Sequence, residues 1–299
     1  MSEYLLAELP RNERLDPWIR LMLSQHLIAR RHVMKKLRPP MSWLLYKYLP
    51  AGRPHSLTNL RDLLVRSLLR LSSPSKFNDP FELAAHFSLE STERQRLARF
   101  EKMARELEPH RGWRAIQAQM RSLMAATTSA EVRPALVRSL NGVRDAAGIY
   151  SFAGDARNTL MWSHYASDHK GICLIFDRAQ DVATFSHAFH VSYARKLPVL
   201  NWIRSFHKDI GKMLFSKHPA WRYEKESRIM INYQAERYLP FAPQALYGMI
   251  FGCRAESPFV NDVNQILAER VLAGHPPVRV YHAQMHPRKY RLVIKNSRR

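Results

Sequence analysis

Hydrophobic positions in the first half of the chain recur with helical spacing. Apolar residues three or four positions apart share one face of a helix, and the leucines within residues 57–68 follow this pattern. They predict a helix over about residues 56–70. Several further amphipathic patterns of mixed charge lie within residues 91–140. We expect these to form a helical insertion at about residues 90–145.

The second half of the chain is dominated by short apolar runs separated by turn residues, which is typical of strands. The run at 172–176 is continuous and predicts a strand buried on both faces. Asn158 is placed to cap a two-turn helix that ends at Tyr165. The predicted strands lie at 43–48, 69–72, 148–152 and 172–176 and at about 188–194, 226–233, 245–252, 277–284 and 289–295, with further helices at about 199–217 and 258–273.

This mixture of helices and short strands predicts an α+β fold with a mixed β-sheet. Near the N-terminus an Asp-Pro pair starts a helical pattern that a pair of prolines ends, and residues 11–38 hold eight Lys or Arg against two acidic residues. We assign residues 1–42 to a basic amphipathic helical arm and residues 43–299 to a single α+β domain that contains the insertion. Packing on the domain and docking onto nucleic acid or membrane both fit the arm.

The chain carries a large excess of positive charge. It has 47 Lys and Arg against 25 Asp and Glu, a formal net charge of +22. Such a surface attracts polyanions, so we expect nucleic acid or another phosphate-bearing partner. A merely solvated basic surface and contact with an anionic membrane are the alternatives. The charge predicts no particular oligomeric state.

Cysteine and histidine usage argues against a metal or disulfide framework. Cys173 and Cys253 are too few for either a set of disulfides or a four-cysteine zinc site. His164 and His169 are five residues apart, which does not match a common zinc pair, so no metal site is predicted. No apolar run approaches the roughly 20 residues that cross a bilayer, and the N-terminus lacks the basic start of a signal peptide. These features favour a cytoplasmic protein.

Two carboxylates and an arginine lie at the start of the strand predicted near residue 226. With a two-residue period, Glu224, Glu226 and Arg228 share one face. Carboxylates crowded beside an arginine are costly to bury, which indicates a cleft with acid/base or electrostatic chemistry. A structural ion-pair ladder on an edge strand is the alternative interpretation.

A second acidic motif, FNDPFE, has the features of a helix start. Asp79 is placed to cap, Pro80 to take the first helical position and Glu82 to reach back from the third. A nuclease interpretation instead gathers Asp79 and Glu82 with Glu224 and Glu226 around Mg²⁺, since two-metal phosphoryl chemistry needs clustered carboxylates. The chain has no glycine-rich phosphate loop, which disfavours a conventional Rossmann or P-loop enzyme.

Four strings of the chain occur in a characteristic order. They are LLYKYL at 44–49, LSSPSKFNDPFE at 71–82, MWSHYASDHKGICLIFD at 161–177 and WRYEKESRI at 221–229, with a weaker YGMIFGCR at 247–254. Together they resemble the bacterial family catalogued as domain of unknown function 2971, over roughly residues 43–295. The family name implies no activity.

The layout of these strings is similar to that of ADP-ribosyltransferases, which implies a small split β-sheet and NAD as substrate. That superfamily places a basic or polar residue on a first strand, a Ser or Tyr on a central strand or the following helix, and a late glutamate. In several members the glutamate belongs to an E-x-E pair, which residues 224–226 match. Lys47 stands where His or Arg is usual, and Ser151 and Tyr165 are the central candidates.

The resemblance implies a role for each candidate catalytic residue. Cleavage of the nicotinamide bond develops positive charge on the ribose carbon, and a fixed carboxylate stabilises that charge. We expect Glu226 to supply this carboxylate and Glu224 to orient or deprotonate the acceptor. Tyr165 is the third catalytic candidate.

The resemblance also implies a set of side chains that contact NAD. Aromatic rings would stack on nicotinamide or adenine, and Lys47 or Arg228 would meet the pyrophosphate. Trp162 equally fits a helix that packs on a sheet. The expected set is Tyr46, Lys47, Tyr48, Ser151, Trp162, His164 and Arg228.

We therefore predict an ADP-ribosyltransferase-like enzyme that modifies a nucleic acid or a nucleic-acid-associated protein, a chemistry that would suit a toxin or a phage-defence effector. Glu226 is expected to face a pocket shared with strand residues 46–48 and helix residues 162–165. The alternatives are a magnesium-dependent nuclease and a non-catalytic module that binds nucleic acid through the N-terminal arm and the basic C-terminal residues 286–299.

Overall fold

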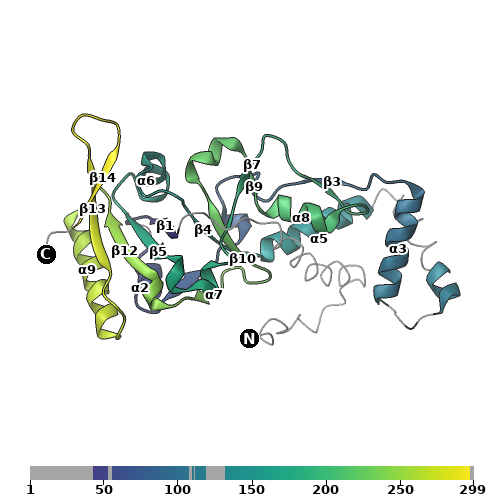
Figure 1. Ribbon diagram of the computed structural model, residues 1–299, viewed down its shortest axis with the longest axis horizontal. Helices are drawn as coiled ribbons and strands as arrows, with labels where there is room; N and C mark the ends of the chain where they lie inside the picture. The colour runs from purple at the N-terminus through teal and green to yellow at the C-terminus, as the bar shows by residue number, and fades with distance from the viewer. Residues whose placement is uncertain (1–42, 53–55, 108–109, 111, 119–131, 297–299) are drawn as a thin grey trace. The chain divides into compact units, whose positions relative to one another are not determined.

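The computed structural model describes residues 43–52, 56–107, 110, 112–118 and 132–296 (Figure 1). The predicted arm at 1–42 lies outside these residues. Within them the protein combines helices with several small β-sheets, so the predicted α+β class is confirmed. Two compact units divide the chain. Of the described residues, the larger one takes those within Leu37–Ala85, Leu140–Pro198 and Lys212–Arg299, and the smaller one takes the others.

The described part of the larger unit is built on a mixed five-stranded sheet. Its first three strands are antiparallel neighbours, the third and fourth are parallel, and the last is antiparallel again. Parallel neighbours need a crossover connection, which helix α9 (Ser257–Leu272) provides. The strands, in order across the sheet, are β1 (Leu44–Leu49), β5 (Ile172–Asp177), β12 (Leu246–Phe251), β13 (Arg279–Met285) and β14 (Leu292–Asn296).

A second sheet of the larger unit has β10 (Ser227–Ile231) in the middle, antiparallel to both β4 (Gly148–Phe152) and β6 (Phe189–His190). A backbone bridge between Tyr46 and Ala153 joins the end of β4 to β1. The two larger sheets therefore meet where β1 passes β4.

Short elements connect these sheets. Asn158 caps α6 as predicted, because its Oδ1 accepts from the backbone N–H groups of Leu160 and Met161. The helices are α2 (Ser56–Leu64), α6 (Thr159–Tyr165) and α7 (Val182–Phe185). The 3₁₀ helices are η1 (Pro74–Lys76), η2 (Arg178–Gln180), η3 (Pro219–Glu224) and η4 (Pro243–Ala245). The short strands form two pairs, β2 (Leu68–Arg70) with β11 (Tyr238–Pro240) and β7 (Ser192–Tyr193) with β9 (Ser216–Lys217).

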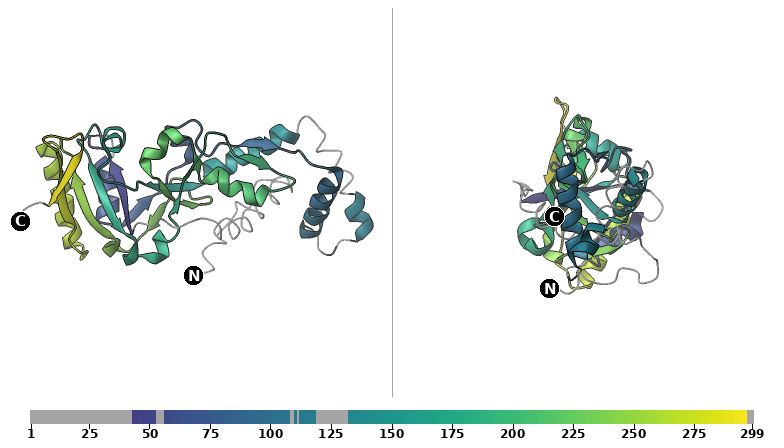
Figure 2. Two further views of the ribbon diagram at one scale, coloured as in Figure 1. Left: turned by 45° about the horizontal axis from the view of Figure 1, so that its top comes forward. Right: turned by 90° about the vertical axis from the view of Figure 1, so that its right-hand side faces the viewer.

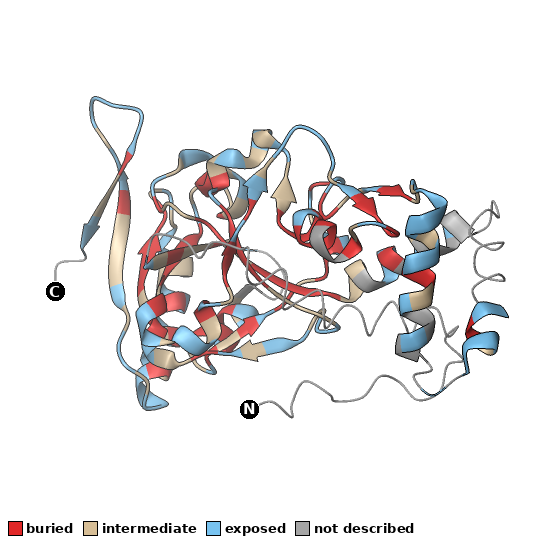
Figure 3. Ribbon diagram, turned by 45° about the vertical axis from the view of Figure 1, so that its right-hand side comes forward, coloured by how far each residue is buried: buried red, intermediate tan, exposed pale blue. Residues whose placement is uncertain are grey.

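Strand β5 is buried on both faces, as its continuous apolar run predicts. Ile172, Leu174 and Phe176 belong to a hydrophobic cluster that includes residues of α2 and α9. Cys173 and Ile175 belong to a second cluster that includes residues of α6. The two-residue period thus gives each face of the sheet its own core. Figure 2 shows α9 running beside the strands of this sheet, and Figure 3 shows buried positions on both strands and helices.

The described part of the smaller unit joins segments that are far apart in the sequence. Phe100 packs near Trp202, with ring centroids 6.0 Å apart. Its elements are α3 (Glu93–Leu107) and the parallel pair β3 (His86–Ser88) and β8 (Val199–Asn201), while α5 (Val132–Ala146) and α8 (Phe206–Leu214) have residues in both units.

The FNDPFE motif does not start a helix, and this prediction was wrong. Residues 80–83 form a turn, in which Asp79 Oδ1 accepts a hydrogen bond of 2.9 Å from the backbone N–H of Phe81. The Glu82 carboxylate binds Arg228 instead of reaching back to the turn. That partner lies 146 positions further along the chain, so a tertiary ion pair overrides the local capping pattern.

Two other predicted helices are shorter than expected. The stretch 199–217 is divided into β8, α8 and β9, because its first residues pair with β3. The helix predicted over 56–70 ends at Leu64, and Leu68–Arg70 pair with β11. None of the helices in the described residues has the length and apolar character that crossing a bilayer requires.

Candidate active site

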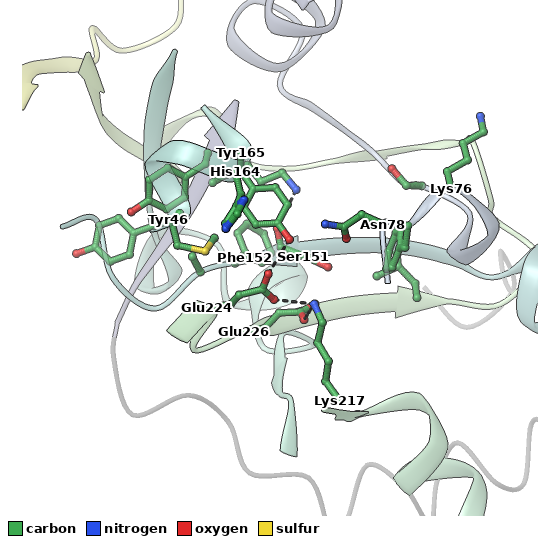
Figure 4. A pocket seen from close by; sticks show the side chains of 17 residues that line it. Tyr46, Lys76, Asn78, Ser151, Phe152, His164, Tyr165, Lys217, Glu224 and Glu226 are labelled. Carbon is green, nitrogen blue, oxygen red and sulfur yellow. Dashed lines mark hydrogen bonds and ion pairs between the residues drawn. The ribbon is translucent and has the colours of Figure 1, made fainter. Parts of the chain in front are cut away.

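A cavity of about 320 Å³ lies in the larger unit, where β1, β4 and α6 meet the junction between η3 and β10 (Figure 4). All ten predicted site residues are described by the structure, and eight of them line this cavity, which we call the pocket. The eight are Tyr46, Lys47, Tyr48, Ser151, His164, Tyr165, Glu224 and Glu226. Other side chains on its wall are Ser72, Lys76, Phe77, Asn78, Phe152 and Lys217.

A left-handed residue turns the chain between the two glutamates. Lys225, with a φ of 46°, separates the end of η3 at Glu224 from the start of β10. The predicted two-residue strand period therefore does not extend to Glu224, yet both Glu224 and Glu226 are buried. Gly154 leaves room for this turn, because a Cβ at that position would lie 2.8 Å from the Lys225 Cβ.

Lys217 on β9 holds three carboxylates together. Its Nζ lies 2.6 Å from Glu224 Oε2, 3.3 Å from Glu226 Oε2 and 3.6 Å from Glu82 Oε2. The side chain of Lys217 is 6% exposed, and those of the three glutamates are 2–5% exposed. Ion pairs so deeply buried are little screened by salt.

Arg228 is the second cation of this group, and its side chain is fully buried. Its Nε and Nη2 bind the two oxygens of Glu226 at 3.0 and 2.8 Å, a bidentate geometry. Its Nη1 donates to Glu82 Oε1 at 2.8 Å and to the Leu214 carbonyl at 3.2 Å. We call Glu82, Glu224, Glu226, Lys217 and Arg228 the carboxylate cluster, whose three anions and two cations leave a formal charge of −1 beside the pocket.

The two glutamates that line the pocket have opposite pKa shifts. Burial raises the pKa of Glu224, a shift that Lys217 opposes and the charge of Glu226 supports. Burial alone would also raise the pKa of Glu226, but Arg228 and Lys217 outweigh it and lower that pKa to about 2. Carboxyl groups with pKa values pushed apart suit one permanent anion and one group that exchanges a proton.

Tyr165 links helix α6 to the carboxylate cluster. Its hydroxyl donates to Glu224 Oε1 at 2.6 Å (Figure 4). Burial raises the pKa of Tyr165 and the charge of Glu224 adds to the shift, so the hydroxyl keeps its proton. Asn158 holds the start of α6 against η3, because its Nδ2 donates to the Tyr223 carbonyl at 2.8 Å.

Lys47 joins β1 to β4 at the pocket wall. Its Nζ donates to the Ser151 carbonyl at 2.9 Å and lies 4.5 Å from the centroid of the Tyr150 ring. Burial lowers the pKa of Lys47 to about 8, against the opposing effect of Glu226 and Glu224. A substantial fraction of this side chain is therefore uncharged near pH 8.

Three of the predicted contacts with NAD need correction. Trp162 is fully buried, donates from Nε1 to the Ala156 carbonyl at 2.8 Å and packs edge-on against Tyr48, so it holds α6 on the sheet and cannot stack on a ligand. Arg228 is fully buried among its carboxylates and cannot meet a pyrophosphate. Tyr48 reaches the pocket wall, but it is only 5% exposed and its hydroxyl donates to the Asp155 carbonyl at 2.6 Å.

Lys217 and Asn78 are pocket residues that the sequence patterns did not indicate. Lys217 lies on a two-residue strand paired with β7, and neither spacing nor a motif marks it. Asn78 lies within FNDPFE, but the helix-start interpretation of that motif gives roles only to its neighbours. The nuclease interpretation placed Glu82 close to Glu224. The two carboxylates do lie close together, but the group that they surround is an ammonium.

The described residues contain no group of three or more His, Cys, Asp and Glu side chains arranged to hold a metal ion. The three clustered carboxylates are bound to Lys217 and Arg228. Asp79, the fourth carboxylate of the nuclease interpretation, accepts from the backbone of its own turn. The geometry therefore gives the magnesium-dependent alternative no support.

A family model described as protein of unknown function (DUF2971) matches residues 161–229. The predicted resemblance to this family is confirmed for this segment. The DUF2971 segment carries Tyr165, Lys217, Glu224 and Glu226, which together make up the acidic side of the pocket. No curated protein and no solved structure matches the chain.

Proposed function

We propose that the pocket binds NAD and transfers its ADP-ribosyl group to a nucleic acid or a nucleic-acid-associated protein. One observation carries the proposal. Lys47 on β1, Ser151 on β4 and the Glu224-x-Glu226 pair before β10 all line a single cavity, as the resemblance to ADP-ribosyltransferases implies. These segments are far apart in the sequence, so their convergence is not a local effect of the chain.

The charge and the walls of the pocket suit the nicotinamide end of NAD. The nicotinamide ring is aromatic and positively charged before transfer. Tyr46 and Tyr165 supply aromatic wall, and the carboxylate cluster lies beside them. Next to Glu224 and Glu226 a cationic ring is favoured over an anion, against the opposing charge of Lys47, which also lines the pocket.

The two glutamates would divide the chemistry between them. As the bond from the ribose carbon to nicotinamide breaks, its electron pair leaves with the ring, which becomes neutral, and positive charge develops on the ribose. Glu226, with a pKa of about 2, stays ionised and is held rigidly by Arg228 and Lys217, so it stabilises that charge without having to reorient.

Glu224 is the better candidate for the proton transfer. Its pKa is raised, and the Tyr165 hydroxyl fixes one of its oxygens. The acceptor atom forms the new bond to the ribose carbon and passes its proton to Glu224. Tyr165 keeps its own proton and acts as a positioning residue for that carboxylate.

The net charge of the chain indicates which class of molecule accepts the ADP-ribosyl group. The net charge of +22 favours a polyanion such as nucleic acid, and the described end of the basic C-terminal segment, with Arg288, Lys289 and Arg291 exposed, offers phosphate contacts. Such a transferase would suit a toxin or phage-defence role in the cytoplasm, where NAD and nucleic acid are both present.

The proposal is tested by incubating the full chain with NAD and RNA, DNA or lysate, and measuring nicotinamide release and transfer of a label from NAD. Glu226→Gln should abolish both. Glu256→Gln is the matched control, because Glu256 is an exposed partner of Lys170 away from the pocket. Tyr165→Phe, which keeps the ring, should lower turnover while leaving circular dichroism unchanged. Wild-type protein that releases no nicotinamide but degrades nucleic acid with Mg²⁺ would replace this proposal with the nuclease.

A further inference from the structure

A second cavity of about 340 Å³ lies in the larger unit next to the pocket. It is bounded by α2, β2 and the ends of β1 and β4, and it shares three wall residues with the pocket, Lys47, Ser72 and Lys76. The function proposed above gives this second cavity no role.

Basic side chains dominate the polar part of the second cavity. Arg70 and Lys76 line it, and both bind Glu236 Oε2, at 2.8 and 2.9 Å. Together with Lys47 they place three basic side chains on the wall of this cavity, against one carboxylate. The side chains of Arg70 and Lys76 are 45% and 60% exposed, so both can turn to a ligand without leaving a buried charge. This wall favours an anion, the opposite of the acidic side of the pocket.

An unpartnered donor lies on the same wall. The Tyr150 hydroxyl is buried and has no hydrogen-bond partner in the described part of the protein. Tyr150 itself is 4% exposed and lines the second cavity, beneath the Lys47 ammonium. A buried hydroxyl without a partner is unfavourable, and a bound acceptor atom would remove that cost.

The rest of the wall is apolar. Leu49 of β1, Leu68 of β2 and Phe259 of α9 line it, and all three are half-buried, so they present apolar surface to the cavity. A free inorganic anion would leave this surface unused. A flat or compact apolar body attached to the anion would cover it.

We propose that the second cavity binds an aromatic phosphate ester, with the phosphate between Arg70, Lys76 and Lys47 and the ring against Leu49, Leu68 and Phe259. The phosphate can accept from the guanidinium in bidentate fashion, and an ester or ring acceptor can satisfy the Tyr150 hydroxyl. The site is a binding site and requires no turnover. The inference therefore stands whether or not the pocket is a transferase.

Calorimetric titration of the full chain with AMP and with phenyl phosphate tests the inference. Both should bind with one-to-one stoichiometry, and inorganic phosphate and adenosine should each bind much more weakly. Arg70→Ala should weaken AMP binding about tenfold or more, since it removes charge-assisted hydrogen bonds. Arg66→Ala is the matched control, because Arg66 is an exposed arginine bound to Asp62 and lies outside the wall of the cavity.

Two further variants decide the location. Tyr150→Phe should weaken AMP binding about threefold or more and leave the protein folded, because it removes only an unsatisfied hydroxyl. Tyr165→Phe alters the pocket and should leave AMP binding unchanged. Absence of saturable AMP binding, or AMP binding that survives Arg70→Ala and is lost in Tyr165→Phe, would overturn the inference. Loss of transferase activity alone would not bear on it.

Discussion

The Lys217 ammonium lies 2.6 Å from Glu224 Oε2, among three carboxylates that would otherwise repel one another. Replacing it with Met keeps the length of the side chain but leaves Arg228 as the single cation of the carboxylate cluster. Breaking a buried pair in this way costs about 3–5 kcal/mol. We expect Lys217→Met to lower the free energy of unfolding, measured by urea denaturation, by about this amount.

Lys170→Met supplies the comparison for that measurement. Lys170 also binds a glutamate at 2.6 Å, but the pair is at the surface, with side chains 51% and 63% exposed. Its removal should change stability little. Equal effects of the two substitutions would show that the carboxylate cluster does not depend on its lysine.

The low pKa of Glu226 links stability to pH. Its pKa falls from 4.5 to about 2 on folding, so the ionised form contributes stability above about pH 4.5. That contribution is lost as the pH falls towards 2. We expect the unfolding free energy of the wild type to decline over this window, and the decline to be shallower in Glu226→Gln. Urea denaturation at several pH values measures both slopes, and parallel slopes would contradict the assigned ion pairs.

Glu224 should show the opposite sign. Its pKa is raised by folding, so its contribution is present below pH 4.5 and is lost as the pH rises through the raised value. The wild type should therefore lose stability as the pH rises above 4.5 towards neutral, and Glu224→Gln should lack this loss. If both glutamine variants changed the pH dependence in the same direction, the division into a permanent anion and a proton acceptor would fail.

Parts of this site were predictable from local patterns. Asn158 caps α6 as expected, and the apolar runs of β4 and β5 set the strands on which Ser151 and the core lie. These features depend on neighbouring residues, which a sequence displays directly. Glu224 and Glu226 do line one pocket, but a left-handed turn at Lys225 separates them where a strand period was predicted.

Among the partners of those glutamates, Arg228 was part of the ion-pair interpretation, but Lys217 and the pairing of Arg228 with Glu82 were not predictable. Lys217 reaches them from a two-residue strand that exists because of its pairing with β7. Glu82 meets Arg228 across 146 positions of sequence, although its local pattern is that of a helix start. Trp162 stands in a motif that suggested ligand stacking, but packing on Tyr48 and a hydrogen bond to Ala156 place it in the core. Each outcome is a tertiary contact that overrides a local preference.

The lowered pKa of Lys47 predicts how stability changes at alkaline pH. Its pKa is lowered from 10.5 to about 8 on folding, so the unfolded chain binds this proton more tightly. Stability from this residue is present above pH 10.5 and is lost as the pH falls through 8. Between pH 8 and 10 the wild type should therefore gain stability relative to Lys47→Met. Wild-type Lys217 has a raised pKa. The wild type should therefore not gain stability in this way relative to Lys217→Met.

The close approach of Gly154 to Lys225 allows the turn between the two glutamates to be tested at a distance from their side chains. A Cβ at position 154 would lie 2.8 Å from Lys225 Cβ and 3.0 Å from its carbonyl oxygen, so Gly154→Ala must displace the turn. We expect a loss of about 1–3 kcal/mol of stability and, because Glu224 and Glu226 both move, a fall in nicotinamide release of about tenfold or more. Gly142→Ala is the matched control, since Gly142 lies on α5 with open space around its Cβ position and should gain stability. A Gly154→Ala protein as stable and as active as the wild type would show that the turn does not position the carboxylates.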